Sequence, residues 1–231
     1  MTKVMVLGLR AFIGAQGGIE THVRDIVSEI VTNHSDAFEV EIIERKPYVI
    51  SDRQIPAALG ALRLTPIWAP RSQNLETIIH TFLGVVHAAV KRPDILHIHG
   101  IGPAIMTPLA KALGLTVVVT HHGEDFAREK WGWFARTVLK LGEWCAAKFS
   151  DARIVIAPAL DKALMQRHNR VFTYIPNAVP ALNEVKDTGL VESLSLQRGK
   201  YILHVGRIVP EKRQLDIINA AANIEVQDWK L

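Results

Sequence analysis

Residues 94–125 read DILHIHGIGPAIMTPLAKALGLTVVVTHHGED, and this stretch decides the fold. Two short runs rich in Ile and Val, residues 95–98 and 117–120, flank residues 103–113, whose apolar positions recur with the period of a helix. A strand, a helix and a second strand in this order predict a βαβ unit with parallel strands. Near-continuous apolar strands such as residues 117–120 are buried on both faces by the connecting helices.

The same alternation continues on both sides of this unit. Further strands are predicted at residues 4–7, 40–43, 154–156, 172–175 and 201–205, and further helices at residues 19–32, 75–91, 128–149, 158–168 and 215–222. The sequence therefore predicts an α/β protein with a doubly wound, Rossmann-like parallel sheet. Ligands bind such sheets at the carboxyl ends of the strands, so we expect the site in the loops that follow them. Residues 51–73 have an irregular pattern that yields no prediction.

Composition and charge limit the classes of protein. The chain has 231 residues, 48% of them hydrophobic and 22% charged, enough for one full domain and part of another. Its net charge of +4 favours anionic partners such as sugar nucleotides or phospholipid head groups, although no dense Lys/Arg run indicates a nucleic-acid face. The single Cys145 excludes an intramolecular disulfide and paired-cysteine metal sites, which suits a reducing cytoplasm. Polar residues interrupt every long apolar run, so neither a membrane-spanning helix nor a signal peptide is predicted.

A glycine-containing loop follows the first predicted strand, from Gly8 to Gly18, and leads into the next helix. Adjacent Gly17 and Gly18 allow a tight turn and the close approach of a ligand, and the first amide groups of the helix attract an anion. An ordinary strand-to-helix loop fits the pattern about equally well. Because the GxGxxG spacing is absent, a nicotinamide-dependent oxidoreductase is disfavoured.

Histidines gather at the ends of the two strands of residues 94–125. His97 and His99 point to the same side by strand alternation, and their strand ends at the same sheet edge as His121 and His122. A metal site is one interpretation, but nothing in the spacing fixes the third and fourth ligands of zinc, so no metal is expected. Hydrogen bonds at strand ends are the better interpretation for His97 and His121. We expect polar binding or acid/base work from at least one of these side chains, because His122 and Asp125 share a glycine-containing loop.

The last part of the chain begins like a second α/β domain. Arg207 directly follows the strand predicted at residues 201–205, and Lys212 lies five residues further on. Arg binds phosphate oxygens in a fork and Lys supplies a mobile charge, so the two form a plausible diphosphate clamp, with a solvated charged loop as the alternative. Because residues 199–231 amount to about one βαβ unit, we expect a second domain that is begun and not completed.

These segments, taken in order, resemble one family, the retaining GT-B glycosyltransferases of family 4. The resemblance rests on five pieces: Gly17-Gly18-x-Glu20-x-His22-Val23, the strand at residues 94–100, Thr120-x-His122-Gly123-x-Asp125, Ile175-Pro176-Asn177-Ala178-Val179, and Gly206-Arg207 with Glu211-Lys212. Each piece is modest, and their ordered combination is fairly specific. Residues 125–143 are also similar to the rhamnosyltransferase-like branch of the family.

The resemblance implies roles for individual residues. Gly18, next to Gly17, would lie against the donor phosphates or the acceptor. His122 would contact the transferred sugar near the reacting carbon, and Asp125 would orient hydroxyl groups. Arg207 and Lys212 would neutralise the diphosphate leaving group in place of a metal ion.

Three more residues are candidate substrate contacts by the same resemblance: Glu20, His99 and Glu211. The chain departs from the family pattern at Ala178, where the hinge usually has Gly, and the glutamate-containing motif that holds the donor would lie beyond Leu231. The chain is therefore expected to have little or no turnover by itself.

The predicted function is transfer of a sugar from a nucleotide-diphosphate sugar to a saccharide or lipid-linked acceptor in cell-surface polysaccharide synthesis. No cofactor, metal or nucleic acid is expected. Residues 1–180 are predicted as the acceptor-side domain, 181–198 as a linker and 199–231 as the truncated start of the donor-binding domain. The expected location is the cytoplasm, with peripheral contact at the inner face of the membrane left open.

Two alternatives remain. The first is a non-catalytic module that binds an acceptor or a membrane through residues 128–149, where aromatic and basic residues interleave. Apolar residues at helical spacing in the same segment favour packing on the sheet instead: Phe134, Val138, Leu141, Cys145 and Phe149. The second and more distant alternative is a sugar-nucleotide epimerase of the same architecture, which needs no acceptor.

Overall fold

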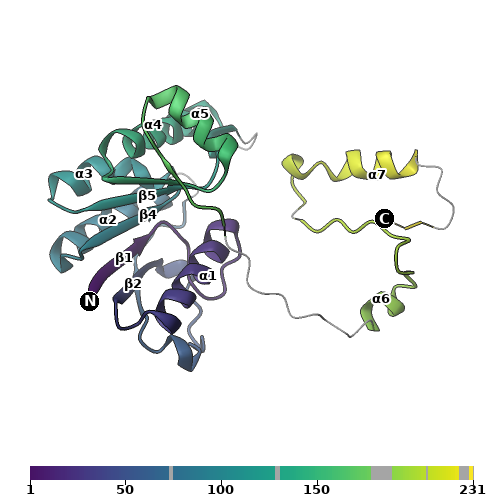
Figure 1. Ribbon diagram of the computed structural model, residues 1–231, viewed down its shortest axis with the longest axis horizontal. Coiled ribbons are helices and arrows are strands. Elements are labelled where there is room, and N and C mark those ends of the chain that lie inside the picture. The colour runs from purple at the N-terminus through teal and green to yellow at the C-terminus, as the bar shows by residue number, and fades with distance from the viewer. Residues whose placement is uncertain (73–74, 128–130, 178–188, 207, 224–228, 231) are drawn as a thin grey trace. The chain divides into compact units, whose positions relative to one another are not determined.

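A computed structural model of the chain describes residues 1–72, 75–127, 131–177, 189–206, 208–223 and 229–230 (Figure 1). The chain divides into two compact units, one containing residues 1–127 and 131–180 and the other containing residues 181–231.

The first unit is built on a seven-stranded parallel sheet with the spatial order β3-β2-β1-β4-β5-β6-β7 (Figure 1). The strands are β1 (Thr2–Leu7), β2 (Phe38–Arg45), β3 (Arg63–Ile67), β4 (Ile95–His99), β5 (Val117–His121), β6 (Ala152–Val155) and β7 (Thr173–Tyr174). The predicted α/β class with a Rossmann-like parallel sheet is confirmed. The strand order reverses between β1 and β4, so the carboxyl ends of these two strands flank the crevice in which such sheets bind ligands.

Helices connect the strands. The α-helices of this unit are α1 (Gly18–Asn33), α2 (Glu76–Lys91), α3 (Thr107–Ala112), α4 (Trp133–Phe149) and α5 (Pro158–His168). Short 3₁₀ helices are η1 (Lys46–Tyr48), η2 (Ala57–Leu59), η3 (Pro103–Met106) and η4 (Asp125–Ala127). The helix predicted at residues 103–113 is thus divided into η3 and α3, and Pro108 lies in the first turn of α3.

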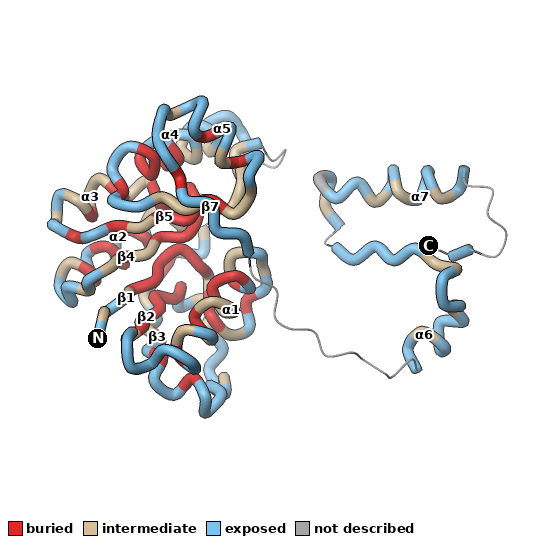
Figure 2. Tube along the Cα trace, viewed as in Figure 1, coloured by how far each residue is buried: buried red, intermediate tan, exposed pale blue. Residues whose placement is uncertain are grey.

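The core lies on both faces of the sheet, as the alternation of side chains along β1 requires. Met5 and Leu7 pack in one apolar cluster with Val85 of α2, whereas Val6 packs in another with Val23 of α1. Figure 2 shows this buried layer as red tube along the central strands and the facing sides of the helices. The sheet is therefore covered on both faces, which fixes the edge formed by the strand ends as a place for a site.

Strand β3 lies in the segment for which the sequence yields no prediction. It pairs with β2 from Glu41 opposite Arg63 to Arg45 opposite Ile67. The strand is at the edge of the sheet and contains Pro66, which has no amide hydrogen to donate and is tolerated at an edge. A short edge strand that contains Pro lacks the apolar pattern by which the other strands are recognised.

Helix α4 packs differently from the sequence prediction. Cys145 is buried, but Phe134, Leu141 and Phe149 are exposed, so their predicted packing on the sheet is wrong. Apart from Glu143, the buried residues of the helix are small, and a Cβ atom on Gly142 would lie 2.0 Å from the carbonyl oxygen of Ile101. This close backbone contact sets the rotation of the helix and turns the large apolar side chains outward.

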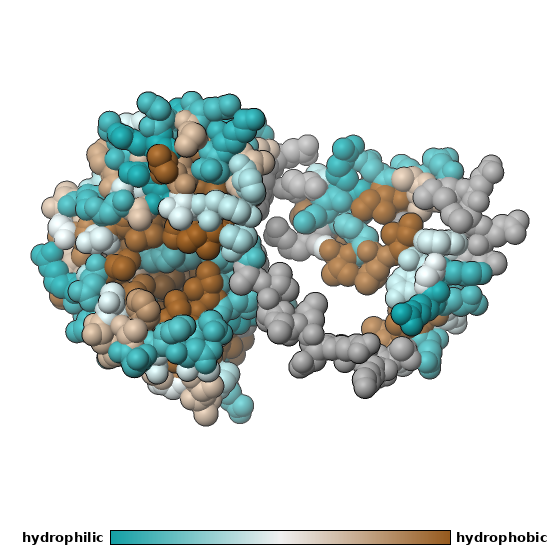
Figure 3. All heavy atoms as spheres, viewed as in Figure 1, coloured by the Kyte–Doolittle hydropathy of each residue, from teal (hydrophilic) through white to brown (hydrophobic). Residues whose placement is uncertain are grey.

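The second unit contains α6 (Gly189–Ser193), the 3₁₀ helix η5 (Pro210–Lys212) and α7 (Gln214–Ala222). The strand predicted at residues 201–205 is wrong, because Tyr201 forms a single bridge with Lys230 and the described residues after it form no ladder. A strand needs a partner along its length to pair its backbone groups. Leu203, Val205 and Ile208 are exposed, and Figure 3 shows apolar surface between α7 and the extended segment before it.

Candidate functional site

The loop after β1 and the end of β4 are in close contact. Gly8, the first residue of this loop, has a φ of +123°, and a Cβ atom there would lie 2.2 Å from the carbonyl oxygen of His99. Only glycine tolerates both the backbone conformation and the approach. Gly8 therefore lets the chain leave β1 directly over the strand that carries His99.

An ion pair between half-buried Arg10 and buried Glu20 shapes the rest of this loop. Oε1 of Glu20 accepts hydrogen bonds from the backbone amide of Arg10 at 3.2 Å and from its Nε at 2.9 Å. Arg10 also donates through Nη2 to the carbonyl oxygen of Gln16 at 2.6 Å. Burial alone would raise the pKa of Glu20, but the hydrogen bonds and charge of Arg10 hold it below its usual value. Glu20 thus faces Arg10 and fixes the loop in front of α1.

Gly17 and Gly18 meet different surroundings at the start of α1. A Cβ atom on Gly17 would lie 2.2 Å from Oε2 of Glu20, whereas one on Gly18 would have no heavy atom within 4 Å. Gly18 therefore has open space beside it, at the end of the helix where the first amide groups favour an anion.

Three histidines from three different elements meet at this edge of the sheet. They are His22 in the second turn of α1, His99 at the end of β4 and His122 directly after β5. Nδ1 of His99 and Nε2 of His122 are 3.0 Å apart and hydrogen-bonded. The ring of His22 packs edge-on against that of His122, with the centroids 4.9 Å apart. One ring nitrogen of each residue lies within 4.8 Å of those of the other two, which is a spacing that also fits the ligands of a metal ion.

The environment keeps these imidazoles uncharged. Burial, followed by repulsion from the neighbouring rings, lowers the pKa of His122 to about 3. The same causes put the pKa of His99 well below its ordinary value, and burial lowers the pKa of His22. At neutral pH the cluster therefore presents neutral rings, whose nitrogens accept or donate hydrogen bonds to hydroxyl groups.

His97 and His121 are occupied by the protein itself. Nε2 of His97 is 2.7 Å from Oγ1 of Thr120, and Nε2 of His121 is 3.0 Å from Oε2 of Glu143. The prediction that these two histidines form hydrogen bonds at strand ends is confirmed. The amide of Gly123 donates to Nδ1 of His121 at 3.3 Å, so the proton of this ring is on Nε2 and points to Glu143.

The buried carboxylate of Glu143, on α4, is the centre of a hydrogen-bond network behind the loop that carries His122. Its other oxygen, Oε1, accepts hydrogen bonds from Nη1 of Arg167 at 2.6 Å and from Nε2 of His168 at 2.8 Å, both from α5. Burial would raise the pKa of Glu143, but the hydrogen bonds from His121, His168 and Arg167 lower it to about 2. The carboxylate therefore ties α4 and α5 to the end of β5 and holds the start of the loop in place.

The structure brings the predicted site residues of the first unit together. Gly17, Gly18, Glu20, His99 and His122 lie at the carboxyl edge of the sheet, and half-buried Asp125 begins η4 in the same loop as His122. The remaining predicted residues belong to the second unit: Lys212 ends η5 and is exposed, while Arg207 and the side chain of Glu211 lie outside the described residues.

Sequence reasoning missed two contributors, His22 and Glu143. Residues three and four apart lie on one face of a helix, so the step from Gly18 to His22 was a signal that both line the same edge. Glu143 is only 2% exposed, and its signal was a single acidic residue within the apolar series of its helix. Neither signal predicts which residue forms the contact. His121 and Glu143, for example, are brought together only by the packing of α4.

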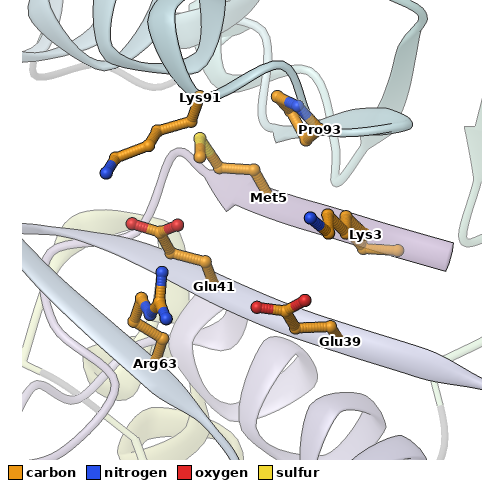
Figure 4. Close-up of a pocket in the computed structure, with 8 residues that line it drawn as sticks. Lys3, Met5, Glu39, Glu41, Arg63, Lys91 and Pro93 are labelled. Atoms are coloured by element: carbon orange, nitrogen blue, oxygen red, sulfur yellow. The ribbon is translucent and has the colours of Figure 1, made fainter. Parts of the chain in front are cut away.

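A pocket lined by charged residues lies at the other edge of the sheet (Figure 4). Lys3 of β1, Glu39 and Glu41 of β2, Arg63 of β3 and Lys91 at the end of α2 surround it. The strand residues among them lie toward the amino ends of their strands, and the opposite charges around the pocket offset one another. The pocket therefore offers no concentration of charge or convergent donors comparable to the carboxyl edge.

Comparison with known families gives one match. The sequence profile of Glycosyltransferase Family 4 matches residues 16–181, which include every element from α1 to β7. No curated protein matches the chain.

Solved structures of low sequence identity share the fold. Sucrose-phosphate synthase from Thermosynechococcus elongatus superposes with a TM-score of 0.73 at 17% identity, covering 97% of this chain and 60% of that one. HepE of Anabaena, in complex with UDP and glucose, gives a TM-score of 0.63 at 16% identity over 96% and 58% of the two chains. UDP-N-acetylglucosamine 2-epimerase from Rickettsia bellii gives 0.52 at 13% identity over 87% and 53%. The chain thus spans about 60% of the length of the first two structures.

Proposed function

The chain belongs to glycosyltransferase family 4, and on this premise we propose that it acts on a nucleotide-diphosphate sugar and transfers the sugar to a saccharide or lipid-linked acceptor in cell-surface polysaccharide synthesis. The protein works in the cytoplasm or at the inner face of the membrane, where such donors and acceptors meet. Within the described residues, no helix combines the length and apolarity needed to cross a bilayer.

One observation carries this proposal: neutral His99 and His122 lie beside the open start of α1 at the switch point of the sheet. His122 contacts the transferred sugar. His99 holds the imidazole ring of His122 in place through their hydrogen bond of 3.0 Å. Asp125 orients a hydroxyl group of the acceptor or donor. Gly18 leaves room for a phosphate or hydroxyl group against the first amides of α1.

The diphosphate of the donor is assigned to Arg207 and Lys212, with Glu211 as a further substrate contact. A neutral histidine cluster carries no positive charge to offset that of the leaving diphosphate, so we give this role to the two cations. The transfer then needs no metal ion. UDP is the first nucleotide to test, because the HepE structure holds UDP and glucose.

We assign little or no turnover to the 231-residue chain by itself. None of the described residues of its second unit is buried, and Val205 and Ile208 are 82% and 94% exposed. Lys212, the described member of the clamp, is exposed, and a charged group that packing does not hold in place contributes little to a transition state. Detectable sugar transfer by the purified chain would contradict this part of the proposal.

Binding tests the proposal without turnover. Saturation-transfer NMR on the purified chain is expected to detect UDP-sugars and short oligosaccharides, and His122→Gln is expected to weaken the contact of the sugar ring by about tenfold. His87→Gln is the matched control, because His87 bonds Glu41 at the other edge of the sheet.

Product analysis separates the enzyme classes. Mixtures of a UDP-sugar and an acceptor are analysed by mass spectrometry and compared with the UDP-sugar alone. Conversion of the sugar without an acceptor would support an epimerase, and equal binding by the unmodified chain and by His122→Gln would remove the role given to His122.

A second candidate function is docking of the same domain on an anionic membrane, and exposed aromatic residues at the start of α4 favour it. Trp133 and Phe134 are 80% and 59% exposed. Leu141 and Trp144 continue the exposed stripe, and Trp144 borders a pocket that Lys148, Arg167 and Arg170 also line. Apolar side chains beside several cations fit the interface of an anionic bilayer.

A further inference from the structure

His22, His99 and His122 form a compact set of three nitrogen donors. Each supplies a ring nitrogen, and these three atoms lie within 4.8 Å of one another. Three histidines are a ligand set of zinc sites that keep one coordination position open. The donors come from the start of α1, the end of β4 and the segment after β5, so the rigid sheet holds the set in place.

The spacing is close to what a tetrahedral ion requires. Zn–N bonds of about 2.0–2.1 Å put two ligand nitrogens about 3.3 Å apart. Nδ1 of His99 and Nε2 of His122 are already 3.0 Å apart. Small rotations of the rings therefore replace their mutual hydrogen bond by two bonds to one ion, and His22 closes the set.

His22 adds an independent sign that a ligand is needed. The residue is buried, and its Nδ1 has no hydrogen-bond partner among the described residues. A buried polar atom without a partner costs about 1–3 kcal/mol, and this penalty is removed when a ligand binds it. His97 differs, because its Nε2 is occupied by Thr120.

We propose that His22, His99 and His122 bind one divalent transition-metal ion, with Zn²⁺ as the expected ion. The strand spacing alone fixes only His99 and His122, and the helix supplies the third ligand. The fourth position is left to water or to a hydroxyl group of a ligand.

This inference goes beyond the proposed function, in which transfer needs no metal. The ion takes the ring nitrogens through which His99 and His122 would meet the sugar. Zn²⁺ therefore competes with the sugar for these nitrogens, so free Zn²⁺ weakens sugar binding by this unit.

The test is direct metal binding by the purified chain, after removal of any affinity tag and treatment with a chelator. Isothermal titration calorimetry with Zn²⁺ at neutral pH is expected to give one ion per chain. Co²⁺, used as a spectroscopic probe, is expected to show the intense visible absorption of a tetrahedral site. None of these readouts needs a sugar, so they stay interpretable whether or not the proposed transfer is correct.

Variants locate the ion. His22→Gln and His122→Gln are each expected to weaken Zn²⁺ binding at least about tenfold, since even groups behind the ligands are worth ten- to a hundredfold. His87→Gln, at the other edge of the sheet, is expected to bind like the unmodified chain. Circular dichroism checks that the variants fold, and His122→Gln carries the test if His22→Gln does not, because His122 is only half-buried.

Three results would overturn the inference: no stoichiometric binding by the unmodified chain, an octahedral Co²⁺ spectrum, or undiminished binding in folded His122→Gln. The first result would mean that the chain has no metal site. Either of the other two would mean that the ion binds to ligands on the surface instead.

Discussion

The two adjacent glycines at the start of α1 differ in how much room they leave for a side chain. A side chain on Gly17 would displace the carboxylate of Glu20 and with it the pair with Arg10, whereas a side chain on Gly18 meets open space. We expect Gly17→Ala to lower the free energy of unfolding by about 1–2 kcal/mol, within the range for overpacking. Gly18→Ala should leave it unchanged or raise it by a few tenths of a kcal/mol, because Ala is the better helix former.

Urea denaturation of the two variants side by side measures this difference. Each variant is the control for the other, since both add one methyl group to the same turn. Equal stabilities would mean that the pair of Arg10 and Glu20 moves aside without loss.

His80 of α2 predicts a pH dependence of stability. Its side chain is fully buried, and burial, followed by the charge of Arg45, lowers its pKa from the ordinary 6.5 to about 4. Between these values the unfolded chain binds the proton and the folded chain does not. The contribution of neutral His80 to the free energy of unfolding is therefore complete above pH 6.5. It is lost as the pH falls toward 4, by up to about 3 kcal/mol.

His80→Leu is expected to remove this part of the pH dependence. The free energy of unfolding is measured at several pH values from 7 to 4.5 for the unmodified chain, His80→Leu and His87→Gln. The difference between the first two should grow as the pH falls, whereas His87→Gln should follow the unmodified chain. A constant difference would show that His80 titrates alike in both states.

The sequence predicts residue contacts only where the spacing along one element contains them. His97 and His99 share a side by strand alternation, and the position of His122 after β5 brings it to the same edge. The bond from His121 to Glu143 joins residues of different elements, and it depends on the rotation of α4. The spacing of residues within β5 or within α4 does not reveal how the helix packs against the strand, so this contact could not be predicted.

At the scale of elements, α4 shows how this rotation is set. Gly142 packs its backbone against Ile101, so the helix buries its small residues and exposes Phe134 and Leu141. The sequence shows that apolar residues recur with the period of a helix. It does not show whether the face with the small residues or the face with the large apolar residues packs on the sheet. Strands are easier to predict because their apolar runs are short and continuous, and β3, an edge strand with Pro66, was missed for lack of such a run.

The exposed stripe of α4 predicts binding to anionic vesicles. The double variant Phe134→Ser with Leu141→Ser is expected to weaken binding to vesicles of phosphatidylglycerol and phosphatidylcholine by at least about a hundredfold, since each large apolar side chain contributes about 1.5–3 kcal/mol when buried. The measurement is liposome flotation, repeated at high salt, which should weaken the attraction of Lys148 and its neighbours.

The matched control lies on α2, where Phe82 and Val86 form another exposed apolar pair four residues apart. Phe82→Ser with Val86→Ser removes comparable apolar area without touching α4. Flotation that falls equally in both double variants would indicate non-specific adhesion, and no flotation of the unmodified chain would exclude membrane docking by this domain.

At the scale of the whole molecule, the topology places the site. The order of strands reverses between β1 and β4, and the glycine loop and His99 follow directly from the ends of these two strands. The place of the site could be predicted from the alternation of strands and helices in the sequence. The absence of a strand at residues 201–205 could not, because a strand depends on a partner elsewhere in the chain, and an apolar run alone does not supply one.

The distribution of buried residues predicts that the first unit folds without the second. Every buried hydrophobic residue that the structure describes lies at or before Phe172, and the apolar side chains of the second unit, such as Leu203 and Leu215, are exposed. Since apolar burial is the main stabilising term, residues 1–180 should carry nearly all of the free energy of unfolding. A chain that ends at Pro180 is therefore expected to unfold within about 2 °C of the unmodified chain, the shift that a few tenths of a kcal/mol produce.

Differential scanning calorimetry of the two chains measures the midpoint, and hydrogen exchange shows where the protection lies. Amides of β1, β4 and β5 should exchange slowly in both chains, whereas those of α7 should exchange in the unmodified chain with almost no protection. Loss of the cooperative transition in the shorter chain, or strong protection in α7, would mean that the second unit takes part in the fold of the first. Retention of the transition would make residues 1–180 sufficient for the histidine cluster, because all three of its rings are carried by that unit.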